Sequence, residues 1–505
     1  MKSTLAFRMR KRRALGAARA LEQAGDHAGA AATLTTLAHS APDQATAIEL
    51  SALAAECLLR AGDVPAGIVD LIRELLTLAD ESAPEESLKL LTRACSLAFA
   101  PSRHLAGKTS PICTDPEAFM AAFQASPSWT NLTASGPPRT TSPRGDGPLS
   151  VLVLADSDHR FSRPLIDAIE AIDSTLDFTV RTLDDIAGSS KSSWPLRPFE
   201  QIQARSKDAD TMNVSEAWYR TLLEAVEGFD VVWVEWCQRT AVLVSLLDLP
   251  HTNVVIRLHS FEAFTVFPHL LKTSGIDSLV TVSPALHSLI NRLRPALAPQ
   301  SVMIPNAVEL LTFAGQKSER AAHTLGLIGW NAPDKDAVWA LDLLAQLRQV
   351  DPRWELVIAG AGPADNAHPY EKDYEAAVRA RADQPDVAGA VTFLGQRDDI
   401  AVVLQDVGVI VSSSVRESFH VAVAEGIASG AFPVIRDWPS LAAFGGPHGT
   451  WPSGSIVSTP EQGAELIQRE FNSHYDAESL LANISALDSS TTAHAMRAVL
   501  RGNSS

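Results

Sequence analysis

Beyond residue 149, short apolar runs alternate with stretches of helical periodicity, and this alternation restricts the fold more than any other feature. The first series of apolar runs covers residues 150–155, 178–183, 230–236, 253–259 and 278–283. The second series covers residues 324–329, 355–360, 391–395, 407–412, 432–435 and 455–458. Short apolar strands that alternate with helices are typical of parallel sheets covered on both faces. The sequence therefore predicts two tandem α/β domains, with ligands bound between them at the carboxyl ends of the strands.

The N-terminal part of the chain has helical periodicity only, and Ala and Leu dominate it. LEQAGDHAGA (21–30) and LLRAGDVPAG (58–67) are similar, and each places a Gly-Asp pair where one helix ends and the next begins. Two interpretations stay open: stacked helical hairpins of the tetratricopeptide kind, and a plain helical bundle. The segment that follows ends in a stretch rich in Ser, Pro, Thr and Gly and is predicted to be a linker. The expected divisions are 1–100 (helical), 101–148 (linker), 149–305 (first α/β domain), 306–480 (second α/β domain) and 481–505 (helix and tail).

Composition and charge restrict the possible partners. The net charge of −17 argues against nucleic-acid binding, which needs a basic face. Four scattered cysteines have no metal-ligand spacing, so a reducing cytoplasm is the default environment. The sequence contains no run of 18 apolar residues, so no membrane-spanning helix is expected. The basic start, MKSTLAFRMRKRRALG (1–16), is read either as a solvated helix end or as a peripheral contact with an anionic inner membrane face.

The segment SVRESFHVAVAEGIASG (414–430) places two glutamates eight residues apart, beside a strand end. A helix is predicted from residue 418, with Glu417 at its start. Its unpaired first-turn donors, which bind phosphate well, would be the backbone N–H groups of Ser418, Phe419 and His420. Glu425 would lie about two turns further, among apolar residues where a charge without a partner is costly. Carboxylates accept hydrogen bonds from sugar and ribose hydroxyls, so the pattern suits a nucleotide sugar.

The stretch ESFHVAVAEGIASGAFPVI resembles the E-x7-E segment of retaining glycosyltransferases with the GT-B fold, the large family-4 (group 1) set. Four other segments follow the order of that family: IPNAVEL, LGLIGWNAPDKDAVWALDLLAQL, IAGAGP and VTFLGQRDDI. Ala307 stands where the family usually has Gly. The resemblance covers roughly residues 149–470 and implies two Rossmann-like domains, the first for the acceptor and the second for the nucleotide sugar.

The resemblance also implies roles for individual residues. Glu417 would bind hydroxyls of the transferred sugar, Glu425 would bind the ribose, and Lys335 would hold the diphosphate and stabilise its departure. His259, at a strand end, would approach the reaction centre. The predicted catalytic residues are therefore His259, Lys335 and Glu417. The predicted donor-binding residues are Trp330, Gln396, Arg397, Arg416, Ser418, Phe419, His420 and Glu425.

The sequence departs from the family in both domains. Trp330 occupies the position of the phosphate-binding arginine, and Arg416 and Arg257 are both candidates to replace that arginine. ADSDHRFSRPL (155–165) replaces a glycine pair of the first domain. The residues predicted on the acceptor or phosphate side are Ser157, His159, Arg160, Glu235 and Arg257. No metal or cofactor is predicted, because GT-B enzymes generally do without a bound metal. Asp156-Ser157-Asp158 matches the D-x-D motif of metal-binding glycosyltransferases, but it lies in the acceptor-side domain.

The expected function is transfer of a sugar from a nucleoside diphosphate to an acceptor hydroxyl, with retention of configuration through attack on the same face. The acceptor would be a carbohydrate, a lipid-linked glycan or a polymer of envelope or surface polysaccharide synthesis. Two rivals remain: an inactive GT-B scaffold whose helical region binds a protein partner or a second copy, and an epimerase that acts on the nucleotide sugar alone. An assay of nucleotide release from the donor distinguishes the transferase from the inactive scaffold. Product analysis with donor alone distinguishes the transferase from the epimerase, which needs no acceptor.

Overall fold

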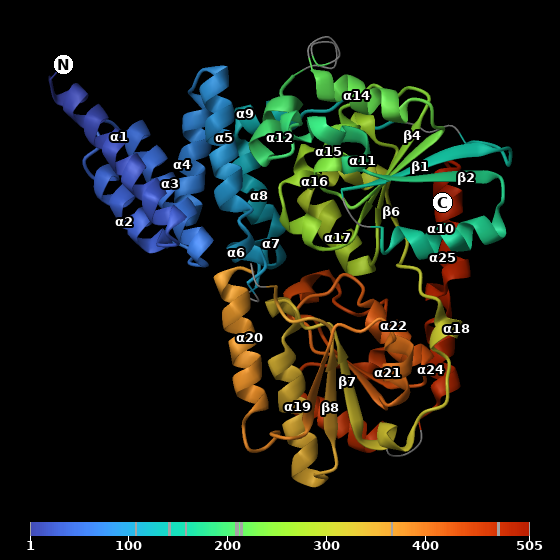
Figure 1. The fold of residues 1–505 in the computed structure, drawn as a ribbon. Helices are drawn as coiled ribbons and strands as arrows, with labels where there is room; N and C mark the ends of the chain where they lie inside the picture. The colour runs from blue at the N-terminus through green and yellow to red at the C-terminus, as the bar shows by residue number, and fades with distance from the viewer. Residues whose placement is uncertain are drawn as a thin grey trace.

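The computed structural model describes residues 2–106, 109–139, 143–156, 159–207, 212, 216–364, 367–471 and 475–503. Figure 1 shows three parts: a helical region at the N-terminus, an α/β domain beside it, and a second α/β domain below both. The predicted architecture of two tandem parallel sheets after a helical region is confirmed.

Five longer helices open the chain, and consecutive helices pack against one another. Their bounds are α1 (Lys2–Gln23), α2 (His27–Ala38), α3 (Gln44–Ala61), α4 (Ile68–Asp80) and α5 (Pro84–Ala98). Gly25 and Gly62 have φ values of 82° and 92°, a left-handed conformation that suits glycine at helix ends. The repeated Gly-Asp pairs therefore mark two equivalent helix ends, whereas the tetratricopeptide-like assignment stays a prediction.

The predicted linker over residues 101–148 is wrong for its first two thirds. Four short helices continue the helical region: α6 (Pro101–His104), α7 (Pro111–Thr114), α8 (Pro116–Ala125) and α9 (Pro127–Thr133). Each begins with a proline, which fits the first helical position because that residue needs no N–H donor. Ser110, Asp115 and Ser126 cap three of these helices through their side chains. The Ser and Pro content that suggested a linker thus belongs in part to helix starts.

The first sheet has six parallel strands in the order β2-β1-β3-β4-β5-β6. These are β1 (Leu149–Ala155), β2 (Leu176–Thr182), β3 (Val231–Glu235), β4 (Asn253–Leu258), β5 (Ser278–Thr281) and β6 (Ser301–Met303). The main covering helices are α10 (Ser162–Ile172), α11 (Leu183–Ala187), α12 (Pro198–Arg205), α14 (Ala217–Val226), α15 (Arg239–Ser245), α16 (Phe267–Leu270) and α17 (Pro284–Leu293). All five strands predicted for this domain are present.

The second sheet also has six parallel strands, in the order β12-β11-β10-β7-β8-β9. They are β7 (Thr324–Ile328), β8 (Glu355–Ala359), β9 (Val391–Gly395), β10 (Val409–Ser412), β11 (Phe432–Arg436) and β12 (Ile456–Val457). Its helices are α18 (Leu310–Phe313), α19 (Ala337–Val350), α20 (Pro369–Ala382), α21 (Ile400–Gln405), α22 (Val421–Ala428), α23 (Pro460–Leu466) and α24 (Ala477–Asn483). All six predicted strands are present here too.

The last helix, α25 (Ser489–Leu500), returns to the first domain and packs against α10 (Figure 1). Its Met496 is buried together with Val151 of β1. Arg501, just after the helix, donates to Asp173 at the end of α10 over 2.8 Å. The C-terminal segment is therefore part of the first α/β domain.

One continuous hydrophobic cluster joins all three parts. It contains Phe123 of the helical region, Val234 of the first sheet, and Phe419 and Trp438 of the second domain. The helical region thus packs against both α/β domains. None of the helices in the described part of the chain has the length and apolarity needed to cross a membrane.

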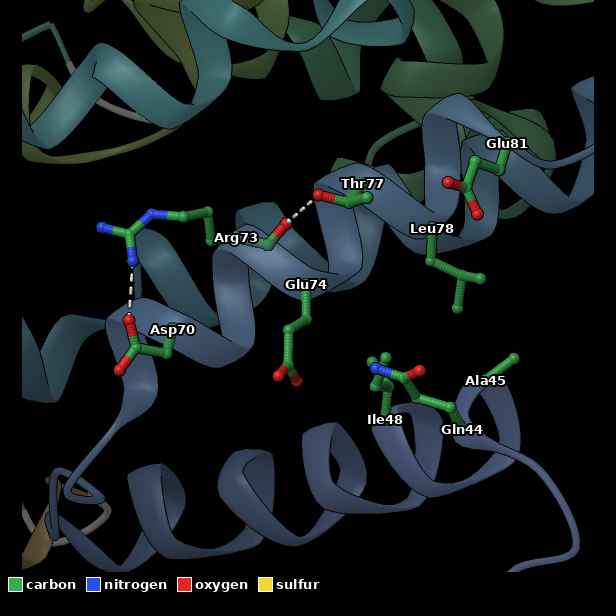
Figure 2. A pocket seen from close by; sticks show the side chains of 9 residues that line it. All are labelled: Gln44, Ala45, Ile48, Asp70, Arg73, Glu74, Thr77, Leu78 and Glu81. Carbon is green, nitrogen blue, oxygen red and sulfur yellow. Dashed lines mark hydrogen bonds and ion pairs between the residues drawn. The ribbon is translucent and has the colours of Figure 1, made fainter.

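A groove of about 670 Å³ lies between α3 and α4 in the helical region (Figure 2). Glu74 points from α4 toward α3, whereas Asp70 is paired with Arg73 at 2.6 Å (Figure 2). Partner binding through this region stays a prediction.

Candidate active site

The carboxyl ends of β7 and β10 lie side by side, because these strands are neighbours in a parallel sheet. The loops that follow them are joined by two hydrogen bonds. The Val415 N–H donates to the Asp334 carbonyl over 2.8 Å, and the Ser413 hydroxyl donates to the Lys335 carbonyl over 2.6 Å. These bonds bring Lys335 and Glu417 together, although the two residues are far apart in the sequence.

Lys335 and Glu417 form the centre of the site. The Lys335 ammonium donates to Oε1 of Glu417 over 2.5 Å, and the Ser414 hydroxyl donates to the same oxygen over 2.7 Å. Burial alone would raise the pKa of Glu417, but Lys335 and then His420 hold that pKa at about 2. Burial opposes the charge on Lys335 as well, and Glu417 and Asp334 nevertheless raise the Lys335 pKa. Both side chains therefore stay charged at neutral pH.

The helix after β10 begins later than predicted. It starts at Val421, and its N-cap His420 has a left-handed backbone with φ of 69°. Ser418 and Phe419 therefore lie before the helix, and the prediction that their N–H groups are first-turn donors is wrong. The donors at the helix start are those of the N-cap His420 and of Val421 and Ala422. The His420 ring lies 2.7 Å from the Ser412 hydroxyl, which holds the residue at the end of β10.

Phe419 and Ser418 differ in their surroundings. Phe419 is fully buried and packs against Trp451 at 5.6 Å between ring centroids, so its side chain belongs to the core rather than to a donor surface. Ser418 is half-buried between Glu417 and Phe419. Of the five predicted residues from Arg416 to His420, Glu417 is therefore the one with clear site chemistry.

Glu425 lies about one turn into α22 and is half-buried. Burial raises its pKa to about 7. Within the part of the chain that the structure describes, no hydrogen bond or ion pair reaches this carboxylate. A buried carboxylate without a partner is costly, and such groups concentrate at functional sites.

Trp330 does not take the place of a phosphate-binding arginine. Its indole N–H donates to the Gly360 carbonyl over 3.1 Å, and the Arg379 guanidinium lies 5.5 Å from its ring. A Cβ at Gly362 would approach the ring to 3.2 Å, a tight contact that would require the ring to shift by a few tenths of an ångström. Trp330 is thus a packing residue, contrary to the prediction.

Neither candidate arginine replaces the missing one in this arrangement. Arg257 is fully buried and donates to Glu235 over 3.2 Å and to the Asn306 side chain over 2.8 Å. Arg416 is also buried and donates to the His104 carbonyl over 2.7 Å. The predicted contact of Lys335 with a diphosphate stays a prediction.

The loop that carries Lys335 has a support that sequence reasoning missed. Asp336 has a left-handed backbone with φ of 41°, an unfavourable conformation for a residue with a Cβ. Arg436, at the end of β11, donates to Asp336 over 2.6 Å and to the Ser413 carbonyl over 3.2 Å. The run Ser412-Ser413-Ser414 at a strand end was the available signal for this hydrogen-bonded edge.

Gln396 and Arg397 are exposed after β9, the edge strand of the sheet. Arg397 forms an ion pair with Asp399, with Nη2 and Oδ2 2.5 Å apart. Because β9 is three strand positions from β10, these residues lie about 14 Å from the Glu417 loop along the sheet. Their predicted contact with the base stays a prediction.

In the first domain, His259 lies at the end of β4 among aromatic rings. Its Nε2 is 2.7 Å from Oε1 of Glu235, and Phe161 stacks on its ring at 4.8 Å. Glu235 is fully buried, and it accepts hydrogen bonds from both Arg257 and His259. Glu235 and Arg257 thus form a buried ion pair beneath His259, which corrects the prediction that they face an acceptor.

The other predicted acceptor-side residues follow β1. His159 is half-buried, with Nε2 3.0 Å from the Arg181 carbonyl. Arg160 is exposed, and Ser157 lies outside the described residues. Asp156 is hydrogen-bonded to the Thr240 hydroxyl. Among the described residues, no group of three or more His, Cys, Asp or Glu side chains is arranged to hold a metal ion.

Two tandem parallel sheets with paired charges at the strand ends of the second sheet define the GT-B class of protein. A family model described as glycosyl transferases group 1 matches residues 322–470. The second α/β domain is therefore similar to this family of glycosyltransferases.

Two similar curated proteins are GDP-mannose:cellobiosyl-diphosphopolyprenol alpha-mannosyltransferases. The one from Xanthomonas oryzae pv. oryzae is 23% identical over 260 residues, which cover 49% of this chain and 66% of that protein. The one from Xanthomonas campestris is 26% identical over 229 residues, covering 43% of this chain and 59% of that protein. The matches thus span less than two thirds of the length of each relative.

Solved structures show the same fold at low sequence identity. The Anabaena protein HepE, solved in complex with UDP and glucose, has a TM-score of 0.52 and 14% identity, covering 70% of this chain and 99% of that chain. Trehalose-6-phosphate synthase OtsA has a TM-score of 0.51 and 12% identity, with 70% and 99% covered. The part outside these matches corresponds in size to the helical region.

Proposed function

We propose that the protein is a retaining glycosyltransferase that transfers a sugar from a nucleoside diphosphate to an acceptor hydroxyl. One observation carries the proposal: a charged Lys335–Glu417 pair stands at the carboxyl edge of the second sheet, and Glu425, which has no partner among the described residues, follows eight residues later. This spacing gives one cation for a diphosphate and one carboxylate for hydroxyls on each side of it.

Donor binding uses groups that are already in position. The Lys335 ammonium has three N–H donors, so it can keep its bond to Glu417 and still donate to a phosphate oxygen. The free N–H groups at the start of α22 and the positive end of that helix favour the same diphosphate. Glu417 accepts from hydroxyls of the sugar, and Glu425 accepts from the ribose.

The transfer step breaks the bond between the anomeric carbon and the diphosphate oxygen. Negative charge grows on that oxygen, and Lys335 stabilises it without further reorganisation. The acceptor hydroxyl then forms the new bond on the same face of the sugar, and its proton passes to the departing phosphate oxygen. His259, at the strand end of the first domain, would lie on the acceptor side of this reaction.

The donor and acceptor classes follow from the relatives' names. GDP-mannose appears in the names of the two mannosyltransferases, and UDP is the nucleotide bound to HepE. The acceptor of the mannosyltransferases is a glycan on diphosphopolyprenol. We therefore propose a GDP- or UDP-sugar donor and a lipid-linked glycan acceptor in envelope polysaccharide synthesis.

The test is ligand-observed NMR of the full chain with a panel that includes GDP-mannose and UDP-glucose. Glu425→Gln should lose donor binding, while Glu355→Gln, an exposed glutamate at the amino end of β8, should keep it. Release of nucleoside diphosphate from the bound donor would show in addition that the protein is a catalyst. Equal binding by both variants would place the donor elsewhere.

The alternative of an inactive GT-B scaffold is favoured by one observation, the packing role of Trp330 in place of a phosphate arginine. The same experiment separates the two. A scaffold would show neither binding by any donor nor release of nucleotide.

A further inference from the structure

Arg416 directly precedes Glu417, yet its contacts lie outside the second domain. Its Nη1 donates to the His104 carbonyl of α6 over 2.7 Å. Its guanidinium carbon lies 4.2 Å from the ring centroid of Phe264, a close cation–π contact. Phe264 belongs to the 3₁₀ helix η2 (Phe261–Phe264), which follows β4 and His259. One side chain therefore joins the helical region, the first domain and the loop of Glu417.

The carbonyl that receives Arg416 is held firmly. The two ring nitrogens of His104 lie 2.7 Å from the Ser110 hydroxyl and 2.8 Å from the Ala98 carbonyl. His104 is buried, and burial lowers its pKa to about 3, so the ring stays neutral beside the guanidinium. Its carbonyl is one of the terminal carbonyls of α6 that need an external donor. Arg416 supplies that donor.

A second contact holds the same loop at Val415, the residue before Arg416. The Ser440 N–H donates to the Val415 carbonyl over 3.0 Å. Ser440 lies in the 3₁₀ helix η7 (Pro439–Phe444), and α7 of the helical region packs against η7. The Arg292 guanidinium lies 5.0 Å from the Phe444 ring and pairs with Glu117 of α8 at 2.7 Å. The helical region thus contacts the Glu417 loop directly through Arg416 and indirectly through η7, which is bonded to Val415.

These contacts argue against Arg416 as a phosphate ligand. The side chain is 5% exposed, one face of its guanidinium is covered by Phe264, and Cys113 lies beside it. Turning it toward a donor would leave the His104 carbonyl unpaired in a buried place, which is costly.

We propose that the N-terminal helical region completes the donor site, with Arg416 as the positioning residue that fixes the Glu417 loop against α6 and Phe264. The proposal rests on the proposed function for its effect on transfer, but not for its effect on the loop. A catalytic carboxylate must be held within a fraction of an ångström, and misplacement by about 1 Å can lower a rate about a hundredfold.

A double-mutant cycle tests the proposal on the full chain, with Arg416→Gln, Phe264→Leu and both together. Hydrogen–deuterium exchange of the peptide covering residues 412–420 is the readout that needs no activity. Each single variant should speed exchange in that peptide, and the double variant should add little, because either change breaks the same contact. Arg379→Gln, which loses a cation–π contact to Phe393 in the same domain, should leave the peptide unchanged.

Kinetics distinguish positioning from ligand binding. A positioning role predicts that Arg416→Gln and Phe264→Leu both lower kcat by about tenfold to a hundredfold with little change in the donor KM, and that Arg416→Lys restores part of kcat. Weaker nucleotide binding in Arg416→Gln together with a wild-type Phe264→Leu would overturn the proposal in favour of a phosphate ligand. Additive exchange effects would overturn it as well. A wild-type protein without transferase activity would refute the proposed function alone, because the exchange experiment still decides the role of Arg416.

Discussion

The ammonium of Lys335 lies 2.5 Å from the carboxylate of Glu417, and the two charges neutralise one another at the edge of the second sheet. Glu417 is buried, with 7% of its surface exposed to solvent. A cation held in this way is oriented before a donor arrives, so little rearrangement is needed when charge develops on a departing phosphate.

Removal of the Lys335 charge should abolish most activity. Lys335→Met keeps the apolar stem but leaves Glu417 buried without its main cation, so the Glu417 pKa should rise from about 2. We expect kcat/KM to fall about a hundredfold to a thousandfold. Steady-state assays of nucleotide release check this, with the exposed Lys372→Met as the matched control. A variant that keeps more than a tenth of the activity would contradict the role.

Glu425 should make stability depend on pH. Its folded pKa of about 7 lies above the usual value of 4.5, so the folded state binds the proton more tightly than the unfolded state. The resulting stabilisation is complete below pH 4.5 and is lost as the pH rises toward 7, by up to about 3 kcal/mol. Urea unfolding at several pH values should show Glu425→Gln gaining stability over the wild type between pH 5 and 8. Parallel curves for the two proteins would refute the raised pKa.

Donor binding should reverse this preference. Ribose hydroxyls donate to the ionised carboxylate and so favour it over the acid. Nucleotide affinity should therefore increase as the pH rises through about 7, with release of a proton on binding. Calorimetry in buffers of different ionisation enthalpy measures that proton. Glu425→Gln should bind weakly with no such proton release, and wild-type binding without proton release would speak against a ribose contact.

Glu235 should be a stability residue, since it neutralises the fully buried Arg257 and orients His259. Glu235→Gln leaves Arg257 without a counter-charge, and we expect a loss of about 3–5 kcal/mol in the free energy of unfolding. Denaturant melts check this against Glu355→Gln, an exposed pair with Arg320 whose loss should cost about 1 kcal/mol or less. Equal losses of stability in the two variants would show that Arg257 does not depend on Glu235 for its counter-charge.

Helix α1 should bind anionic lipid weakly. Arg8, Arg12 and Arg13 are exposed, and the nearby Met9 is 55% exposed. Three basic residues near a membrane surface contribute about 3 kcal/mol together. The affinity for phosphatidylserine vesicles, measured by co-sedimentation, should therefore fall about a hundredfold when all three arginines are changed to Gln. The affinity of the wild type should also fall as the salt concentration rises. Binding that is insensitive to salt would exclude this electrostatic contact.

The sequence by itself determined the two sheets and all eleven predicted strands, and it singled out Lys335, Glu417 and Glu425 as candidates. These features depend on local sequence. Apolar runs indicate strands buried on both faces of a sheet, and the segment from Glu417 to Glu425 indicates a strand end followed by a helix. The helix start was misplaced by three residues, because the left-handed His420 is stabilised by Ser412 rather than by its neighbours in the chain.

Only the tertiary structure decided what the arginines do and where the helical region belongs. Arg257 and Arg416 were equal candidates for a phosphate, and their partners, Glu235 in one case and the His104 carbonyl in the other, lie 22 and 312 residues away in the chain. A long cationic side chain can reach in many directions, and its direction is set by which buried acceptor it must satisfy. That choice depends on how the three parts pack together, which no local pattern records.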